Sequence, residues 1–159
     1  MRMFEFIKSR LNQQINGGYY NQPQNNFHLI ENALCILLVD VAKADDDFSA
    51  NKRAKIISLM KKYFDIDEKG AAELIVSAED YFKREDSFYE YAVMINENFS
   101  TENKYELLKD LWRLAFADAK TDVYEESMVK KIGGLLDVDY QAVINAKLYV
   151  KEELKGRLF

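Results

Sequence analysis

The hydrophobic residues between Phe27 and Ala44 recur at three- and four-residue steps, and this pattern constrains the fold more than any other feature. The stripe is wide and continuous, and it consists of Leu29, Ile30, Ala33, Leu34, Leu37, Leu38, Val41 and Ala42. Such a stripe indicates a helix that is largely buried in a core. The longest apolar run within it, residues 33–39, is far shorter than the roughly 20 residues needed to span a bilayer. We therefore expect a soluble helical protein without membrane insertion.

The remainder of the chain shows the same helical period. It predicts further helices over residues 2–15, 50–64, 67–82, 88–98, 105–117 and 124–136, and from residue 140 onward. The single Pro and six Gly leave long windows for helix, and no segment alternates as a strand does. We expect an all-α bundle of about seven to eight helices. Residues 1–26 form an N-terminal helix and a flexible loop over 16–26, and residues 27–159 form the helical domain.

The net charge of the chain limits the class of partner. A formal charge of −5 and a pI of about 5.0 argue against a nucleic-acid partner, because phosphate contacts need a basic surface. A cation or a basic protein partner fits better, and a homo-oligomer is compatible with this composition. The single cysteine, Cys35, cannot form an internal disulfide, and the charged N-terminus is unlike a signal peptide. We expect a cytoplasmic protein.

Two helix-to-helix turns, at Asp45 and at Asp118, resemble each other. Residues 41–45 (VAKAD) align with residues 114–118 (LAFAD), which matches both alanines and both aspartates at an offset of 118 − 45 = 73 residues. The apolar positions of the helix after each turn align as well. Because the match covers a helix, a turn and a return helix, we interpret it as an internal duplication that builds a pseudo-twofold bundle.

The second turn carries three carboxylates in a short connection. Asp118 ends one helix, Asp122 lies in the loop, and Glu125 lies in the first turn of the next helix. A short antiparallel connection can bring such side chains together with the carbonyl groups freed at the helix end. Oxygen ligands of this kind suit Ca²⁺ or Mg²⁺. The first candidate metal site is therefore Asp118, Asp122 and Glu125.

The same turn also has a purely structural interpretation. The spacing Asp122-x-x-Glu125 is that of a capping box, in which Asp122 caps the helix and Glu125 bonds back to its backbone N–H. Acidic residues also suit the positive end of a helix dipole. Asp118 is not used by the capping box, so capping and metal binding both stay open.

The first turn holds more acidic residues than the second turn, but it lacks the counterpart of Glu125. Residues 45–49 read Asp-Asp-Asp-Phe-Ser, and Lys52 occupies the position that corresponds to Glu125. A protonated lysine cannot be a metal ligand, so this copy has lost that role. Asp40, which lies one helical turn before the Ala44-Asp45 pair, can substitute in part for the missing ligand. The second candidate metal site is Asp40, Asp45 and Asp47.

On these residues the chain resembles the tellurite-resistance TerB family, together with the TerB-like region found ahead of some DnaJ-type co-chaperones. The mark of the family is an Ala-Asp-Gly turn followed by an aliphatic residue and a Glu, occurring twice in an all-helical domain. Residues 39–49 and 111–136 resemble the two copies, with Asp46 and Ala119 in place of the glycine. The resemblance implies a bundle with an acidic surface suited to divalent metal, associated with tellurite or other chemical stress and with membrane-linked complexes.

No motif in the chain marks an enzyme. Nucleotide-binding glycine loops and the serine-hydrolase elbow are absent from the sequence, and the single histidine excludes sites that need two. We expect a non-enzymatic TerB-like module whose acidic turns bind a divalent cation, Ca²⁺ or Mg²⁺, or an unidentified protein partner. The alternatives are an interaction scaffold without metal, whose turns only cap helices, and, more remotely, a carboxylate-dependent hydrolase.

Overall fold

The computed structural model describes residues 23–44, 48–83, 89–118 and 123–157, and within these ranges its regular secondary structure is α-helix alone. Its helices are α2 (Pro23–Ala42), α3 (Ala50–Tyr63), α4 (Glu68–Lys83), α5 (Tyr89–Asn98), α6 (Thr101–Ala115), α7 (Val123–Leu135) and α8 (Tyr140–Arg157). The expected all-α fold is confirmed. None of these helices is long and apolar enough to cross a bilayer. The helix expected at residues 2–15 lies outside the described ranges, and the internal duplication stays a prediction.

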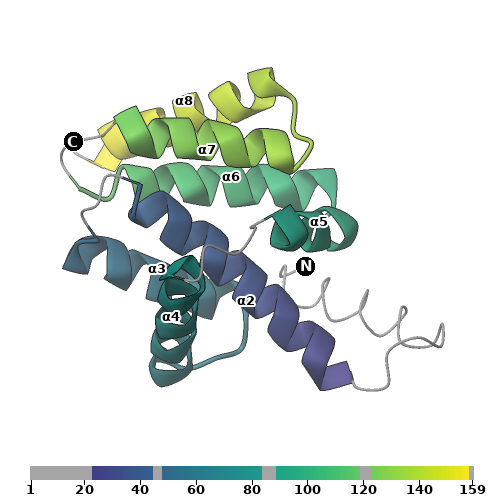
Figure 1. Cartoon of the computed structure of the whole chain (residues 1–159). Helices are drawn as coiled ribbons and strands as arrows, with labels where there is room; N and C mark the ends of the chain where they lie inside the picture. Colours follow the sequence, from purple (N-terminus) through teal and green to yellow (C-terminus); the bar gives the residue numbers. More distant parts are fainter. Residues whose placement is uncertain (1–22, 45–47, 84–88, 119–122, 158–159) are drawn as a thin grey trace.

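Helix α2 runs through the middle of the bundle (Figure 1). It contacts α3, α4, α5, α6 and α7. Leu34, Leu37 and Leu38 of its apolar stripe are each 0% exposed. In Figure 1, α6, α7 and α8 form a layer on one side of α2, and α3 and α4 lie on the other. The stripe is wide because neighbours surround this helix on several sides.

Helix α2 begins at Pro23, four residues before the predicted start at Phe27. The loop predicted over residues 16–26 is therefore wrong for residues 23–26, and residues 16–22 lie outside the described part of the chain. Proline suits the first turn of a helix because its fixed φ is helical and its missing N–H would have no intrahelical acceptor there.

Polar side chains cap three of the helix starts. Ser49 and Ser100 accept hydrogen bonds from the backbone N–H three residues further on, at 3.2 and 3.1 Å. Asp67 accepts a hydrogen bond from the Gly70 N–H at 2.8 Å, before α4. Each bond satisfies a donor that has no partner within the helix. Ser49 is thus the N-cap of α3, and Ser100 is the N-cap of α6.

Helices α7 and α8 approach each other closely. A Cβ atom at Gly133 would lie 2.6 Å from Cγ2 of Val143 on α8, so a side chain does not fit there. After α7 the chain reverses at Asp137, whose φ of 56° is in the left-handed region. This conformation lets the N–H groups of Asp137 and Val138 bond to carbonyls of the last turn of α7, at 3.1 and 3.0 Å. Helix α8 consequently folds back along α7 (Figure 1).

Candidate functional site

The two acidic turns are joined through Asp118. The Ser49 hydroxyl donates to Oδ2 of Asp118 at 3.0 Å and lies 3.2 Å from Oδ1. The Asn51 amide adds a contact of 3.5 Å to the same carboxylate. Because Ser49 also accepts the Lys52 N–H, Asp118 is bonded to the cap of α3. The end of α6 is thus anchored on the start of α3.

Lys52 lies fully buried between the two turns. Its Nζ donates to the carbonyl oxygen of Ala42, at the end of α2, over 3.3 Å. The same Nζ lies 3.1 Å from Oε1 of Glu125 and 3.8 Å from Oδ2 of Asp118. A cation at the end of a helix is also favoured by the helix dipole. One ammonium group therefore contacts α2, α7 and the second turn together.

Glu125 reaches this ammonium from the first turn of α7 and is itself 0% exposed. A carboxylate at such depth is very costly unless an opposite charge or hydrogen-bond donors compensate it. Lys52 supplies that charge. Lys52 and Glu125 are the two positions that the repeat alignment equates. From the sequence alone, Lys52 was only a residue that replaces a metal ligand.

The ammonium stands where the first candidate metal site would hold its ion. Asp118 and Glu125 converge on Lys52 Nζ, whereas Asp122 lies outside the described residues. Ca²⁺ and Mg²⁺ need about six or more oxygen ligands at roughly 2.0–2.6 Å. No group of three or more His, Cys, Asp or Glu residues in the described ranges is arranged to hold a metal. The described part of this turn fits a buried ammonium better than a divalent cation.

Of the second candidate metal site, only Asp40 belongs to the described residues; Asp45 and Asp47 lie outside them. Asp40 is on α2 and partly exposed. Burial raises the pKa of its carboxyl to about 6, and the charge of Lys131 on α7 opposes this shift. The second site and the capping box at Asp122 both stay predictions.

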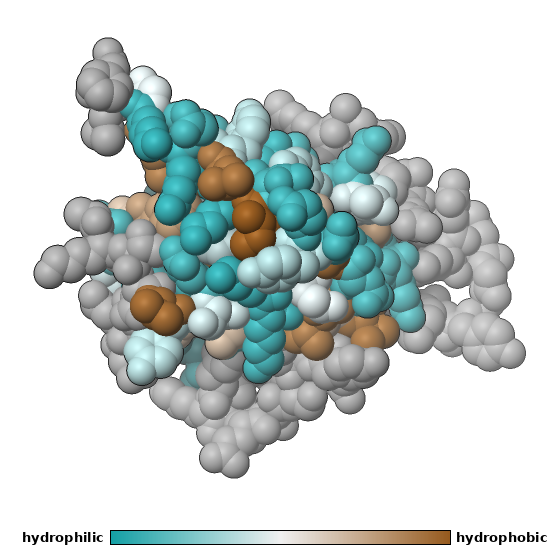
Figure 2. All heavy atoms as spheres, turned by 90° about the horizontal axis from the view of Figure 1, so that it is seen from above, coloured by the Kyte–Doolittle hydropathy of each residue, from teal (hydrophilic) through white to brown (hydrophobic). Residues whose placement is uncertain are grey.

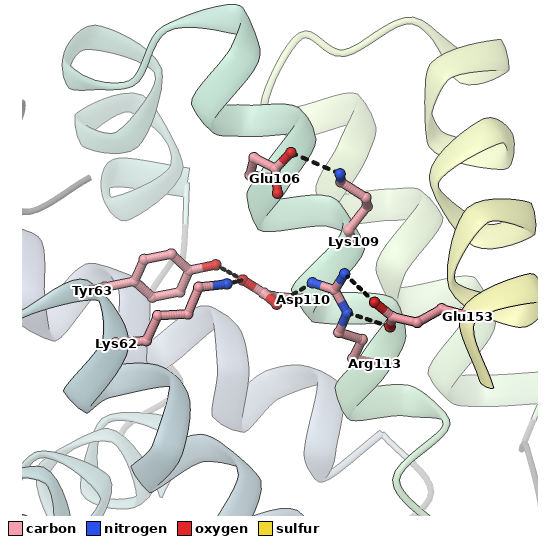
Figure 3. Close-up of polar contacts among 7 residues, drawn as sticks. All are labelled: Lys62, Tyr63, Glu106, Lys109, Asp110, Arg113 and Glu153. Atoms are coloured by element: carbon pink, nitrogen blue, oxygen red, sulfur yellow. Dashed lines mark hydrogen bonds and ion pairs between the residues drawn. The ribbon is translucent and has the colours of Figure 1, made fainter. Parts of the chain in front are cut away.

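A second charged cluster, which the sequence analysis missed, joins α3, α6 and α8 (Figure 3). Asp110 on α6 is 1% exposed and accepts hydrogen bonds from the Tyr63 hydroxyl and, at 3.0 Å, from Lys62 Nζ. Its other oxygen lies 2.7 Å from Nη1 of Arg113. Arg113 donates two further bonds, at 2.9 and 3.0 Å, to Glu153 on α8. Its hydrogen bonds to Glu153 and Asp110 raise the pKa of Arg113.

This cluster is balanced in charge, with two acids and two bases. Networks whose members all have partners make a fold rigid and specific. We therefore assign it a structural role, which is to hold α3 and α8 against α6. The sequence carried a weak signal for it: Asp110 interrupts the apolar stripe between Leu108 and Leu111, and Arg113 follows at the spacing of an intrahelical ion pair.

Fold and site together define an all-α module built around two acidic turns that meet over a buried lysine. The tellurite resistance protein TerB family matches residues 31–148, and the chain belongs to this family. The matched range runs from α2 into α8 and includes both turns. No curated protein and no solved structure matches the chain. The resemblance inferred from the two Ala-Asp turns is confirmed.

Proposed function

We propose that this chain is a non-enzymatic TerB-family module that binds a protein partner and keeps its two acidic turns joined without a divalent cation. One observation carries the proposal: Lys52 Nζ lies among the Ala42 carbonyl, Asp118 and Glu125. An ammonium that belongs to the chain neutralises the buried carboxylate in every folded molecule. The module is then independent of the concentration of free Ca²⁺ or Mg²⁺.

The burial of the charged groups argues against a catalytic role. A general acid or base must come within hydrogen-bond reach of a substrate. Lys52 and Glu125 are each 0% exposed, and Asp110 is 1% exposed. These three groups contact oppositely charged side chains. Such pairing supports a role in packing, and it disfavours a carboxylate-dependent hydrolase.

Binding of Ca²⁺ or Mg²⁺ at the second turn is the alternative. It is favoured by one feature, the convergence of Asp118 and Glu125 on a single position. The ammonium of Lys52 would first have to leave that position. Because Lys52 is fully buried, its departure would expose a cavity or require the first turn to move.

Calorimetric titration of the full chain with Ca²⁺, Mg²⁺, Mn²⁺ and Zn²⁺ separates the two functions. We expect no saturable heat and no change in melting temperature for the wild type. Lys52→Gln removes the positive charge but keeps a polar side chain, so binding that appears only in this variant would identify Lys52 as the group that excludes the ion. Saturable binding by the wild type that is lost in Asp118→Asn and Glu125→Gln would refute the proposal.

The family name gives the proposed biological setting. We place the module in a cytoplasmic response to tellurite or another chemical stress, on the basis of its membership of the tellurite resistance protein TerB family. Deletion of the gene in the native cell should lower the tellurite concentration that arrests growth. Complementation with the wild-type chain should restore it, and unchanged growth of the deletion strain would contradict this setting.

A further inference from the structure

Helix α8 presents an apolar stripe on its outer side. Tyr140 and Leu148 are 61% and 53% exposed, and the partly exposed Ile144 lies between them. Their spacing of four residues places all three on one side of the helix, and Lys151 continues the same side. The opposite side of α8 packs on α6 and α7. The stripe extends over eight residues, or about 12 Å of helix.

Helix α7 adds to this stripe from the neighbouring position. Glu126 of α7 bonds to Lys147 of α8 at 3.2 Å, so this side of α7 faces α8. Val123 and Lys130 precede and follow Glu126 by three and four residues and lie on the same side. Val123 is 75% exposed. We define the α7–α8 face as Val123, Lys130, Tyr140, Ile144, Leu148 and Lys151.

The charge of the α7–α8 face is opposite to that of the chain. The chain carries −5, whereas this face carries Lys130 and Lys151 and no acid. The neighbouring Glu126 is already paired with Lys147. Figure 2 looks onto this side of the molecule and shows apolar residues set among hydrophilic ones. Single exposed apolar residues are ordinary, but an apolar stripe at helical spacing with two lysines beside it is complementary to an amphipathic helix with acidic flanks.

We infer that the α7–α8 face binds an amphipathic helix of a partner protein whose apolar stripe is flanked by acidic residues. The inference rests on the proposed function, since it names the partner of that module. Anchors at every third or fourth residue of a docked helix match the spacing of Tyr140, Ile144 and Leu148. The lysines at the edges pair with the acidic flanks of the helix.

Charge favours a helix over an anionic bilayer as the occupant. A bilayer presents negative charge to every acidic residue that comes within a Debye length, about 8 Å at physiological salt. The chain has 27 acidic residues against 22 basic ones, so an extended anionic surface repels it. A single helix meets only the α7–α8 face, where the local charge is positive.

The test is a titration of the isotope-labelled full chain, followed by NMR, with two synthetic helical peptides. Each peptide has about 18 residues, or five turns, with a leucine stripe flanked by Glu in one and by Lys in the other. We expect shifts clustered on α7 and α8 with the acidic peptide, and binding of the basic peptide at least about tenfold weaker. Equal binding of the two peptides, or shifts centred on other helices, would overturn the inference.

Variants sharpen this test. Lys130→Glu with Lys151→Glu should invert the preference, so that the basic peptide binds about tenfold better than the acidic one. Leu148→Asp should abolish binding, whereas Val76→Asp, a substitution of a comparably exposed residue (56%) on α4, should leave it unchanged. Because all four positions are surface positions, melting temperatures should stay close to that of the wild type. Failure of the inverted preference would show that charge does not select the partner.

Two further measurements test the other occupants. Sedimentation on vesicles of phosphatidylserine and phosphatidylcholine should show no binding, and ultracentrifugation should show no dimer that Leu148→Asp dissolves. Either positive result would assign the α7–α8 face to a membrane or to a second copy and overturn the inference. The metal titrations are independent of this face. Metal binding by the wild type would therefore refute the proposed function whatever the peptides do, and peptide failure alone would leave it standing.

Discussion

Replacing Lys52 with methionine keeps the apolar stem of the side chain but removes the charge that neutralises Glu125. At 3.1 Å the attraction between the two charges is about 5 kcal/mol for an effective dielectric constant near 20. Desolvation costs several kcal/mol for each ion, so the pair contributes little net stability, but a single remaining charge is uncompensated. We expect Lys52→Met to lower the free energy of unfolding by about 3–5 kcal/mol. That is a large part of the roughly 5–15 kcal/mol typical of a domain.

The double variant Lys52→Met with Glu125→Leu tests whether the unpaired charge causes this loss. An apolar pair needs no desolvation, so we expect it to come within about 1–2 kcal/mol of the wild type. Urea unfolding followed by circular dichroism at pH 7 measures both, with the slope m as a check on two-state behaviour. Lys61→Met, at an exposed position of the same helix, is the control and should change stability by under about 0.5 kcal/mol. A loss for Lys52→Met no larger than that of this control would contradict the expectation, as would a double variant that is less stable than Lys52→Met alone.

Three further predictions can be tested with the same urea assay. Gly133→Ala should lower stability by about 1–3 kcal/mol because its Cβ meets Val143, whereas Gly134→Ala, with open space around it, should raise stability by about 0.5–1 kcal/mol; equal effects would argue against the close approach of α7 and α8. Asp137→Gly should raise stability by about 0.5–1 kcal/mol because glycine adopts a φ of 56° without strain, and a loss would contradict this. Burial raises the pKa of Asp40 from 3.8 to about 6, so the folded state favours the neutral carboxyl. The contribution of Asp40 to the stability of the fold is therefore fully present below about pH 4 and is lost as the pH rises through about 6. Asp40→Asn should therefore be more stable than the wild type by about 1–2 kcal/mol at pH 7, after allowance for partial exposure, and by much less at pH 4; the same difference at both values would refute the assignment.

The boundaries of most helices could be predicted because their signals are local. Ser49 precedes an apolar period and caps α3, and the last helix begins at Tyr140 as its pattern indicates. The start of α2 was missed because Pro23 follows a Gly-Gly pair in a polar segment, where proline usually marks a loop. The same residue is equally compatible with a first helical turn, and no local pattern distinguishes the two.

The contacts of Lys52 with Glu125 and Asp118 were predictable only in part. The alignment of the two turns identified Asp118, Glu125 and Lys52 as the residues that matter, but it treated Lys52 and Glu125 as alternatives at one position. Whether they meet depends on how α3 and α7 pack, since 125 − 52 = 73 residues separate them. Asp110 is a similar case, because a single acid within an apolar stripe lies at the surface of one bundle and in the interior of another.

The sequence by itself determined the helices, their caps and the acidic character of both turns, because each of these depends on residues within a few positions of one another. The tertiary structure decided which charge neutralises which. It placed the ammonium of Lys52 against Glu125, at the turn where the sequence alone left a metal site and a helix cap both open. The physical reason is distance: the energy of a buried ion pair depends on a few ångströms between helices, and no local pattern records that separation.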